Sequence, residues 1–370
     1  MVEAPAEAAR LFNAANPEEV VFSHSSTMNL DNVARALEGD IKEGDEFVIT
    51  GEHEANVGPW KKLAKRRGAV IKTWKATPTV ADNPYSVGYK TAELLPLITA
   101  KTRIVAISAC SNILGTIVPV KDVVAAVRAA AKAHGARKVE VSVDCVAYAP
   151  HRFIDVQDWD VDFAVFSFYK VYGPHISALY TRSASLASLS PLVHHFLRLD
   201  HSAYKLQPGG PGYELAYATT GAVAYLRSLT PSGDIRAAFA AIAQHEQTLV
   251  APLLAFLTDP EQRARGVRIV GEENADLSRV PTISFVVGGQ KPIRSRDVVK
   301  VFDQKGGMLT IGAWTQIGIR FGHFYAYTLV DELRPKLDID DGVVRVSFVH
   351  YNTLQDVERV IEILKEVLAA

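Results

Sequence analysis

Cysteine is scarce in this sequence. The 370 residues include two cysteines, Cys110 and Cys145, which are too few for a disulfide framework and suggest a reducing compartment. No run of about 18 apolar residues occurs, so we expect no membrane span. The acidic N-terminus lacks the long apolar segment of a signal peptide. We therefore predict a cytoplasmic protein.

An excess of charge of one sign is also lacking. The 40 Lys and Arg residues are balanced by 41 Asp and Glu residues, which argues against a nucleic-acid partner. Phosphate-binding loops, nucleophile elbows and dinucleotide-binding glycine motifs are missing. His194, His195 and His201 cluster without the carboxylate or cysteine partners of a recognised metal motif, so we expect no metal site.

The first half of the chain alternates apolar runs with helical patterns. Apolar runs occur at 46–50, 69–74, 103–109, 139–143 and 162–166, separated by helical patterns at 57–67, 91–99 and 120–134. Strands separated by helices favour a mostly parallel sheet with helices on both faces. Ligands of such sheets bind at the carboxyl ends of the strands.

The second half predicts a smaller α/β domain. We expect helices at 214–229, 235–257, 295–306 and 354–369, strands at 267–270 and 282–287, and a polar turn at 259–265. We place the domain boundary at 235, which gives a large domain at 1–235 and a small C-terminal domain at 236–370.

An acidic and a basic residue follow two of the predicted strands. Asp144 comes directly after 139–143, and Lys170 follows 162–166. Adjacent strand ends would bring them to one crevice, where a lysine is costly to bury unless it is paired or bonded as an imine. Pyridoxal phosphate (PLP) chemistry needs this pair, because lysine forms the Schiff base and aspartate keeps the pyridine nitrogen protonated. From these two residues alone, a surface ion pair explains the pattern equally well.

Other polar residues at predicted element ends fit the same cofactor. Ser25 and Ser26 precede a helical run, where hydroxyl and amide groups can cradle a phosphate or simply cap the helix. His53 follows a strand and would stack on a planar ring or face solvent. Asn112 would donate a hydrogen bond to a phenolate oxygen or lie in a turn. Arg345, inside an apolar run, must meet an anion such as a substrate carboxylate or lie at a sheet edge.

Together these segments resemble the class V aminotransferase superfamily of PLP-dependent fold type I enzymes, in its cysteine desulfurase-like branch. The resemblance runs from Asn16 to the C-terminus. It rests on the motifs Asp-Glu-x-Val-Ile, His-Glu-Ala-Asn-Val-Gly-Pro-Trp, Ser-Asn-Ile-Leu-Gly-Thr, Ser-Phe-Tyr-Lys-Val-Tyr-Gly-Pro-His and Arg-Val-Ser-Phe-Val-His-Tyr-Asn-Thr. It implies an α/β fold with a large, mostly parallel mixed sheet flanked by helices, a smaller C-terminal α/β domain, PLP as cofactor, a small amino-acid substrate and a homodimer.

The resemblance also implies a role for each matching residue. Lys170 would bond to the cofactor and move the Cα proton, Asp144 would pair with the ring nitrogen, and His53 would stack on the ring. The cofactor-binding residues would be Lys170, Asp144, His53, Ser25, Ser26, Asn112, Ser167 and Tyr169. The substrate-binding residues would be Arg345, Arg320 and Asn112.

One departure from the family changes the expected reaction. Tyr325, within Arg-Phe-Gly-His-Phe-Tyr-Ala, occupies the position of the loop cysteine that receives sulfur in desulfurases, and no cysteine follows Cys145. A persulfide relay through this loop is therefore excluded. We expect a C–S lyase that eliminates the β-substituent of cysteine or of a cysteine S-conjugate or sulfoxide, with His323 or Tyr325 protonating the leaving group.

Three alternatives stay open. An amino-acid epimerase would use the same Lys170 without a β-leaving group, and a cysteine desulfurase would need an external thiol acceptor. A non-catalytic protein with the PLP fold is the third. Two departures from the family suggest a non-catalytic protein. Ala147 replaces a residue that contacts the ring hydroxyl in relatives, and Gly210 lies in the segment that reaches a neighbouring subunit's phosphate in relatives.

Overall fold

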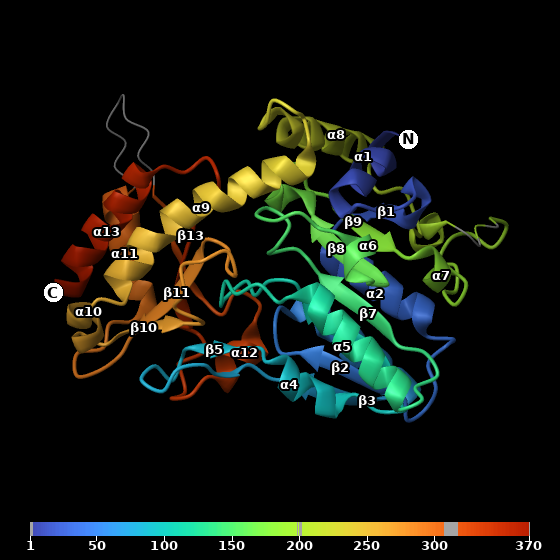
Figure 1. Ribbon diagram of the computed structural model, residues 1–370, viewed down its shortest axis with the longest axis horizontal. Helices are drawn as coiled ribbons and strands as arrows, with labels where there is room; N and C mark the ends of the chain where they lie inside the picture. Colours follow the sequence, from blue (N-terminus) through green and yellow to red (C-terminus); the bar gives the residue numbers. More distant parts are fainter. Residues whose placement is uncertain (1–2, 198, 200–201, 307–316, 370) are drawn as a thin grey trace. The chain divides into compact units, whose positions relative to one another are not determined.

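The computed structural model describes residues 3–197, 199, 202–306 and 317–369 (Figure 1). These residues form two compact units. The N-terminal unit contains Met1–Lys75, Lys90–Cys110 and Val118–Ala241, and the C-terminal unit contains Ala76–Tyr89, Ser111–Ile117 and Ile242–Ala370. The division into domains at residue 235 stays a prediction.

A seven-stranded sheet forms the centre of the N-terminal unit. Its strand order is β1-β9-β8-β7-β6-β2-β3. The strands are β1 (Val20–Ser23), β2 (Glu46–Thr50), β3 (Val70–Trp74), β6 (Thr102–Ser108), β7 (Glu140–Asp144), β8 (Phe163–Ser167) and β9 (Ser177–Thr181). The neighbours from β8 to β3 are parallel, and β9 is antiparallel to both β8 and β1. The expectation of a large, mostly parallel mixed sheet is therefore confirmed.

Helices cover both faces of this sheet, as Figure 1 shows for α5 in front of it and α2 behind it. The helices of the unit are α1 (Glu3–Phe12), α2 (Ser26–Leu37), α3 (Gly58–Arg67), α4 (Thr91–Leu94), α5 (Val120–Ala133), α6 (Val156–Trp159), α7 (Ser183–Leu186), α8 (Tyr213–Ser228) and the first turns of α9 (Ile235–Leu257). Helix α5 buries Val120, Val123, Val124 and Val127, the spacing of a single apolar helix face.

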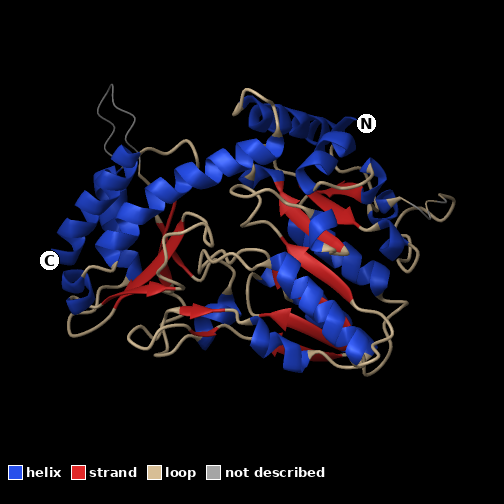
Figure 2. Ribbon diagram, viewed as in Figure 1, coloured by secondary structure: helices blue, strands red, loops and turns tan. Residues whose placement is uncertain are grey.

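The C-terminal unit is built on an antiparallel sheet in the order β10-β11-β13-β12. Its strands are β10 (Val267–Val270), β11 (Thr282–Val287), β12 (Arg320–Gly322) and β13 (Val343–Ser347), beside the short pair β4 (Thr77–Pro78) and β5 (Val87–Gly88). Its other helices are α10 (Pro260–Ala264), α11 (Ser295–Gly306), α12 (Tyr327–Glu332) and α13 (Leu354–Ala369). Apolar side chains of α11 and α13 pack with β11 and β13 in one core, and Figure 2 shows helices beside the strands of both units.

One predicted turn is a helix in the structure. The polar segment 259–265 contains α10, because the Asp259 side chain accepts a hydrogen bond from the Glu261 amide and Pro260 occupies the first helical turn. Both features start helices, so the prediction of a turn there was wrong.

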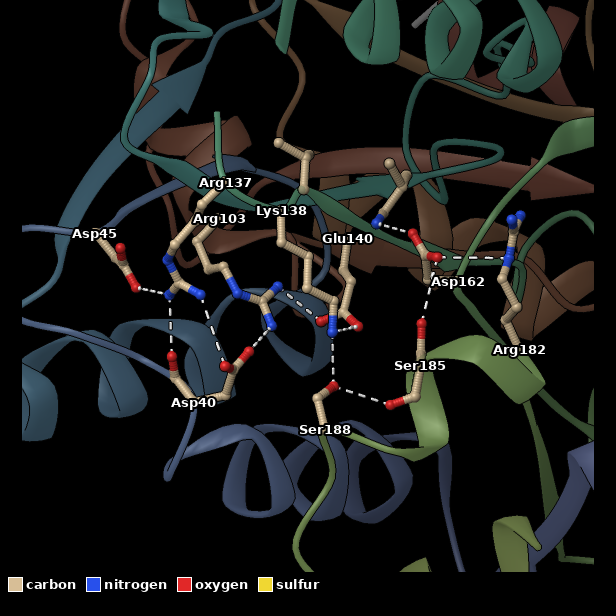
Figure 3. A network of polar contacts seen from close by, with 12 residues as sticks. Asp40, Asp45, Arg103, Arg137, Lys138, Glu140, Asp162, Arg182, Ser185 and Ser188 are labelled. Carbon is tan, nitrogen blue, oxygen red and sulfur yellow. Dashed lines mark hydrogen bonds and ion pairs between the residues drawn. The ribbon is translucent and has the colours of Figure 1, made fainter. Parts of the chain in front are cut away.

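Charged side chains form a network at the amino ends of the central strands (Figure 3). Arg103, at the start of β6, is fully buried and donates to Glu140 Oε2 at 2.7 Å and to Asp40. Lys138 lies 2.9 Å from Glu140 Oε1. Burial alone would lower the pKa of Arg103, but attraction and hydrogen bonds from Glu140 and Asp40 raise it overall. The charges at this edge therefore neutralise one another.

Removing one member of the network should be costly. We expect Arg103→Met to lower the free energy of unfolding by about 3–5 kcal/mol, because it leaves Glu140 buried without its main partner. Urea denaturation measures this loss. The control is Arg66→Met, whose ion pair with Glu38 is exposed and contributes about 0–1 kcal/mol. Equal losses in the two variants would contradict the prediction.

Candidate active site

Two neighbouring strands of the N-terminal unit carry the predicted acid and amine. β7 ends at Asp144, and the short 3₁₀ helix η4 (Phe168–Lys170) follows the end of β8. The strands are parallel, with Asp144 opposite Val165, so both side chains belong to the same edge of the sheet. The structure places Asp144 and Lys170 close enough to interact electrostatically, while their catalytic roles stay predictions.

The Asp144 carboxyl group is only 5% exposed. Burial raises its pKa, while the charge of His53, a hydrogen bond from the Val146 amide at 2.9 Å and the charge of Lys170 oppose the rise. A carboxylate in such a place is stabilised by a further cationic partner. A protonated pyridine nitrogen is a partner of this kind.

His53 reaches the same edge from β2. It caps the 3₁₀ helix η2 (Glu54–Asn56), and its Nδ1 accepts a hydrogen bond from the Ala55 amide at 3.1 Å. The imidazole lies close enough to Asp144 to lower the pKa of that carboxyl group.

Hydroxyl groups gather at the N-terminus of α2. Ser25 is the N-cap, and its Oγ accepts a hydrogen bond from the Met28 amide at 3.2 Å. The amide groups of the first turn and the helix dipole favour an anion at this end. The helix N-terminus and its hydroxyls are therefore a suitable place for a phosphate group.

One proton per hydroxyl fixes the direction of the hydrogen bonds behind Ser25. Ser177 donates to the Phe166 carbonyl at 2.7 Å and accepts from Asn29 at 3.0 Å. Ser26, 2.9 Å from Ser177, must therefore be the donor in that pair, and Ser167, 2.8 Å from Ser26, must be the donor in the next. The protons of Ser26 and Ser167 both point inward. Ser167 ends the chain, so it can turn its proton outward and leave the other bonds intact.

Tyr169 lies beside the lysine and is exposed. Its ring stacks on His175 with centroids 5.1 Å apart, and Lys170 Nζ lies 5.8 Å from the Tyr169 ring centroid. Burial and the negative charge of Asp144 raise the pKa of Tyr169, so its hydroxyl stays protonated and able to donate a hydrogen bond.

The C-terminal unit holds the predicted substrate residues together. Asn112 Nδ2 donates to the Phe324 carbonyl at 2.9 Å, and Arg345 donates to the Asn112 carbonyl at 2.9 Å. The Asn112 Oδ1 is buried and has no hydrogen-bond partner among the described residues. Part of the hydrogen-bonding capacity of Asn112 is thus used by the protein, and one acceptor is left.

Arg345 lies on β13 directly opposite Arg320 of β12. Among the described residues no carboxylate forms an ion pair with Arg345, whereas Arg320 is largely exposed and lies 3.9 Å from Asp303. Burial lowers the pKa of Arg345 to about 10. A half-buried guanidinium with a like charge across the strand is well suited to bind an anion.

The turn after β12 contains the two proposed proton donors. Its Phe324 and Tyr325 have φ of +49° and +62°, and the Tyr325 side chain is 70% exposed. His323 Nδ1 accepts from the Tyr325 amide at 3.2 Å, which leaves the proton of a neutral ring on Nε2.

No set of metal ligands accompanies these residues. In the described part of the chain, no group of three or more His, Cys, Asp or Glu side chains is arranged to hold a metal ion. His201, part of the histidine cluster noted in the sequence, lies outside the described residues. Among the same residues, no helix has the length and apolar character needed to cross a bilayer.

Comparison with known proteins defines first the fold and then the family. The structure superposes on the cysteine desulfurase of Escherichia coli, in its S-sulfonic acid form, with a TM-score of 0.79 and 24% identity over 99% of this chain and 83% of that one. The fold is therefore that of the PLP-dependent fold type I enzymes.

The sequence matches the family Aminotransferase class-V over residues 1–360. It is 39% identical to an aminotransferase-like protein of Gibberella zeae, over 98% of this chain and 81% of that protein. It is 33% identical to a cysteine desulfurase-like protein of Aspergillus flavus, over 96% of this chain and 74% of that protein. The chain belongs to the class-V aminotransferase family and is a PLP-dependent enzyme of its cysteine desulfurase-like group, with PLP as cofactor.

The residues of the N-terminal unit fit this cofactor. The buried carboxyl group of Asp144 suits the ring nitrogen, the Lys170 amine suits the aldehyde carbon, and the capped start of α2 suits the phosphate. Sequence reasoning missed Ser177 and Asn29, which orient the serine hydroxyls. The segment Ser177–Thr181 does not alternate polar and apolar residues, and all five residues are buried, so its sequence carries no clear signal of this strand.

The direction of the hydroxyl chain makes a test of phosphate binding possible. We expect Ser167→Ala to weaken PLP binding to the apoprotein about tenfold, the effect of one lost hydrogen bond to a charged group. Ser26→Ala should change it by less than about twofold, because the Ser26 proton points to Ser177. Absorbance titration gives both affinities.

Pyridoxal, which has no phosphate, is the control ligand. Its affinity should be the same in both variants and the parent, since only the phosphate contact is altered. A tenfold loss of PLP affinity in Ser26→Ala, with pyridoxal unaffected, would contradict the assigned direction.

Proposed function

We propose that this enzyme is a carbon–sulfur lyase that acts on cysteine, a cysteine S-conjugate or a cysteine sulfoxide by β-elimination. The Cα–H and Cβ–S bonds break, the electron pair leaves with sulfur, and the three-carbon product hydrolyses to pyruvate and ammonia. The sulfur is released as a small molecule rather than held on the chain.

The state of the two cysteines is the observation that carries this proposal. Neither Cys110 nor Cys145 forms a disulfide, and both are buried. Burial and the charge of Asp144 raise the pKa of Cys145 well above its usual value. Sulfur transfer needs an accessible thiolate, and the family resemblance places Tyr325 at the position of the desulfurase loop cysteine. This chain therefore offers no thiol suited to accept sulfur.

The proposed roles follow from the charges and hydrogen bonds of each side chain. Bound PLP supplies an electron sink that makes the Cα proton of an amino acid acidic. Asp144 keeps the ring nitrogen protonated, and the Lys170 amine accepts the Cα proton. Arg345 binds the α-carboxylate through the guanidinium N–H groups that the Asn112 carbonyl leaves open. His323 Nε2 or the Tyr325 hydroxyl protonates the leaving sulfur.

A homodimer in the cytoplasm is the second part of the proposal. The exposed side of α8 carries Tyr213, Tyr217 and Tyr225, which are 51%, 61% and 38% exposed. Tyrosines are enriched in subunit interfaces because they bury a large apolar area and keep a polar end. This face supports association with a second copy of the chain, and the low cysteine content supports a reducing compartment.

Product analysis tests the reaction. The PLP-loaded protein should release pyruvate and ammonia from at least one compound in a panel of cysteine, S-conjugates and sulfoxides. Lys170→Ala should abolish release, and Lys121→Ala, at an exposed lysine, should not. The lyase proposal fails if none of the panel yields pyruvate.

The same reactions distinguish the alternatives. Racemised substrate carrying solvent deuterium, without pyruvate, indicates an epimerase. Alanine formed from cysteine only when a thiol acceptor is added indicates a desulfurase. Absence of any turnover, even with bound PLP, indicates a non-catalytic protein.

Leaving-group chemistry tests the proton donor. We expect His323→Gln to lower kcat about 100-fold for an S-alkyl cysteine, whose basic alkyl thiolate needs a proton to leave, since general acid catalysis contributes roughly 10²–10⁴-fold. A conjugate with an acidic aryl thiol needs no proton to leave, so its kcat should fall by less than about threefold. Tyr325→Phe is assayed in parallel. Equal loss for both substrates in the two variants would exclude proton donation from this turn.

A further inference from the structure

The turn at Phe324 has a strained backbone and is held in place by side chains from other segments. Phe324 and Tyr325 are consecutive non-glycine residues in the left-handed backbone region. Each such residue is disfavoured and persists only where surrounding contacts hold it. Such positions are concentrated at ligand-binding and catalytic sites.

Three residues of the C-terminal unit hold the turn in a closed cycle, which we call the Phe324 clasp. The Asn112 side chain donates to the Phe324 carbonyl, and Arg345 donates to the Asn112 carbonyl. The Arg345 guanidinium carbon lies 3.8 Å from the centroid of the Phe324 ring. Asn112, Phe324 and Arg345 therefore fix one another although they come from three separate segments.

The clasp restricts how Arg345 can bind an anion. The Phe324 ring covers one face of the guanidinium, and one N–H group is occupied by the Asn112 carbonyl. Among the described residues no carboxylate pairs with Arg345. None of its remaining N–H groups is among the buried, unpartnered polar atoms, so they are accessible to a ligand. The open part of the group is its edge, which is the geometry for bidentate binding of a carboxylate.

We propose that Phe324 is a positioning residue, whose ring sets the plane of the Arg345 guanidinium so that its open N–H edge receives the substrate α-carboxylate. This inference rests on the proposed role of Arg345 in binding an amino acid. In this proposal the same contacts orient the carboxylate-binding group and fix the turn that carries His323 and Tyr325.

Phe324→Leu tests the proposal with the least disturbance. Leucine keeps an apolar side chain and the same left-handed backbone cost, but it removes the negative face of the aromatic ring. Phe324→Tyr restores that face. Phe321→Leu, on exposed β12, is the control for loss of a phenylalanine from the same segment.

The measurement compares two ligands that differ only in the carboxylate. Alanine and ethylamine are titrated into each holoenzyme, and binding is followed by the change in cofactor absorbance. Phe324→Leu should weaken alanine binding about 3- to 30-fold, the range of a partly desolvated cation–π contact. Ethylamine should bind within about twofold of the parent value. Phe324→Tyr and Phe321→Leu should resemble the parent for both ligands.

A loss of affinity that is equal for alanine and ethylamine would overturn the proposal, as would unchanged alanine binding in Phe324→Leu. For substrates that turn over, KM should rise while kcat changes by less than about twofold. If Phe324→Leu does not fold, Phe324→Met provides the same comparison.

The outcomes separate this inference from the proposed reaction. Selective loss of alanine binding, together with no pyruvate from any cysteine derivative, would support the clasp and reject the lyase. If Arg345→Lys binds alanine as tightly as the parent does, the carboxylate role of Arg345 and the proposal for Phe324 fail together, whatever the reaction catalysed.

Discussion

A buried carboxyl group at the end of one strand is the constraint on which the candidate site depends. Asp144 is placed by β7 and Lys170 by the turn after β8, and parallel pairing of these strands brings both to one edge. Burial works against ionisation of Asp144, and the positive charges of His53 and Lys170 work for it. Lys170 would hold bound PLP through its aldehyde. The protonated ring nitrogen would then supply a cationic partner for Asp144, which the protein itself leaves buried at the end of β7.

The two edges of the sheet differ in how their charges are satisfied. At the amino ends, Arg103 is buried between Glu140 and Asp40, and Lys138 also pairs with Glu140. That network closes within the protein and therefore contributes to stability without calling for a ligand. Arg345, in the C-terminal unit, has no acidic partner among the described residues. Unbalanced charge that is held in a fixed orientation, rather than charge alone, is what distinguishes a binding group from a structural one.

The sequence could predict the parts of the fold that depend on local pattern. The apolar runs at β2, β6, β7 and β8 and the helical spacing of α5 gave correct elements, because buried parallel strands and amphipathic helices have distinct periods. The antiparallel strand β9 was not anticipated, and with it Ser177, because pairing between distant segments leaves no local mark. Asn112 was expected beside the cofactor ring. The structure shows that one of its N–H groups is occupied by the Phe324 carbonyl, a contact across more than two hundred residues that no local pattern encodes.

Tyr325, which the family resemblance places at the position of the desulfurase loop cysteine, lies in a turn with a constrained backbone. A loop that carries sulfur must move between the substrate and an acceptor, so its contacts with the rest of the protein have to be weak. Here the neighbouring Phe324 is held through its carbonyl by Asn112 and through its ring by Arg345. A turn fixed in this way can present the tyrosine hydroxyl and the His323 ring in constant positions, which suits proton transfer and does not suit transport. The lack of a thiol and the fixed position of the turn therefore both favour release of sulfur over its transfer along the chain. In the proposed lyase, the residues at the edge of the central sheet would activate the amino acid, and this short segment outside the sheet would set the fate of the sulfur.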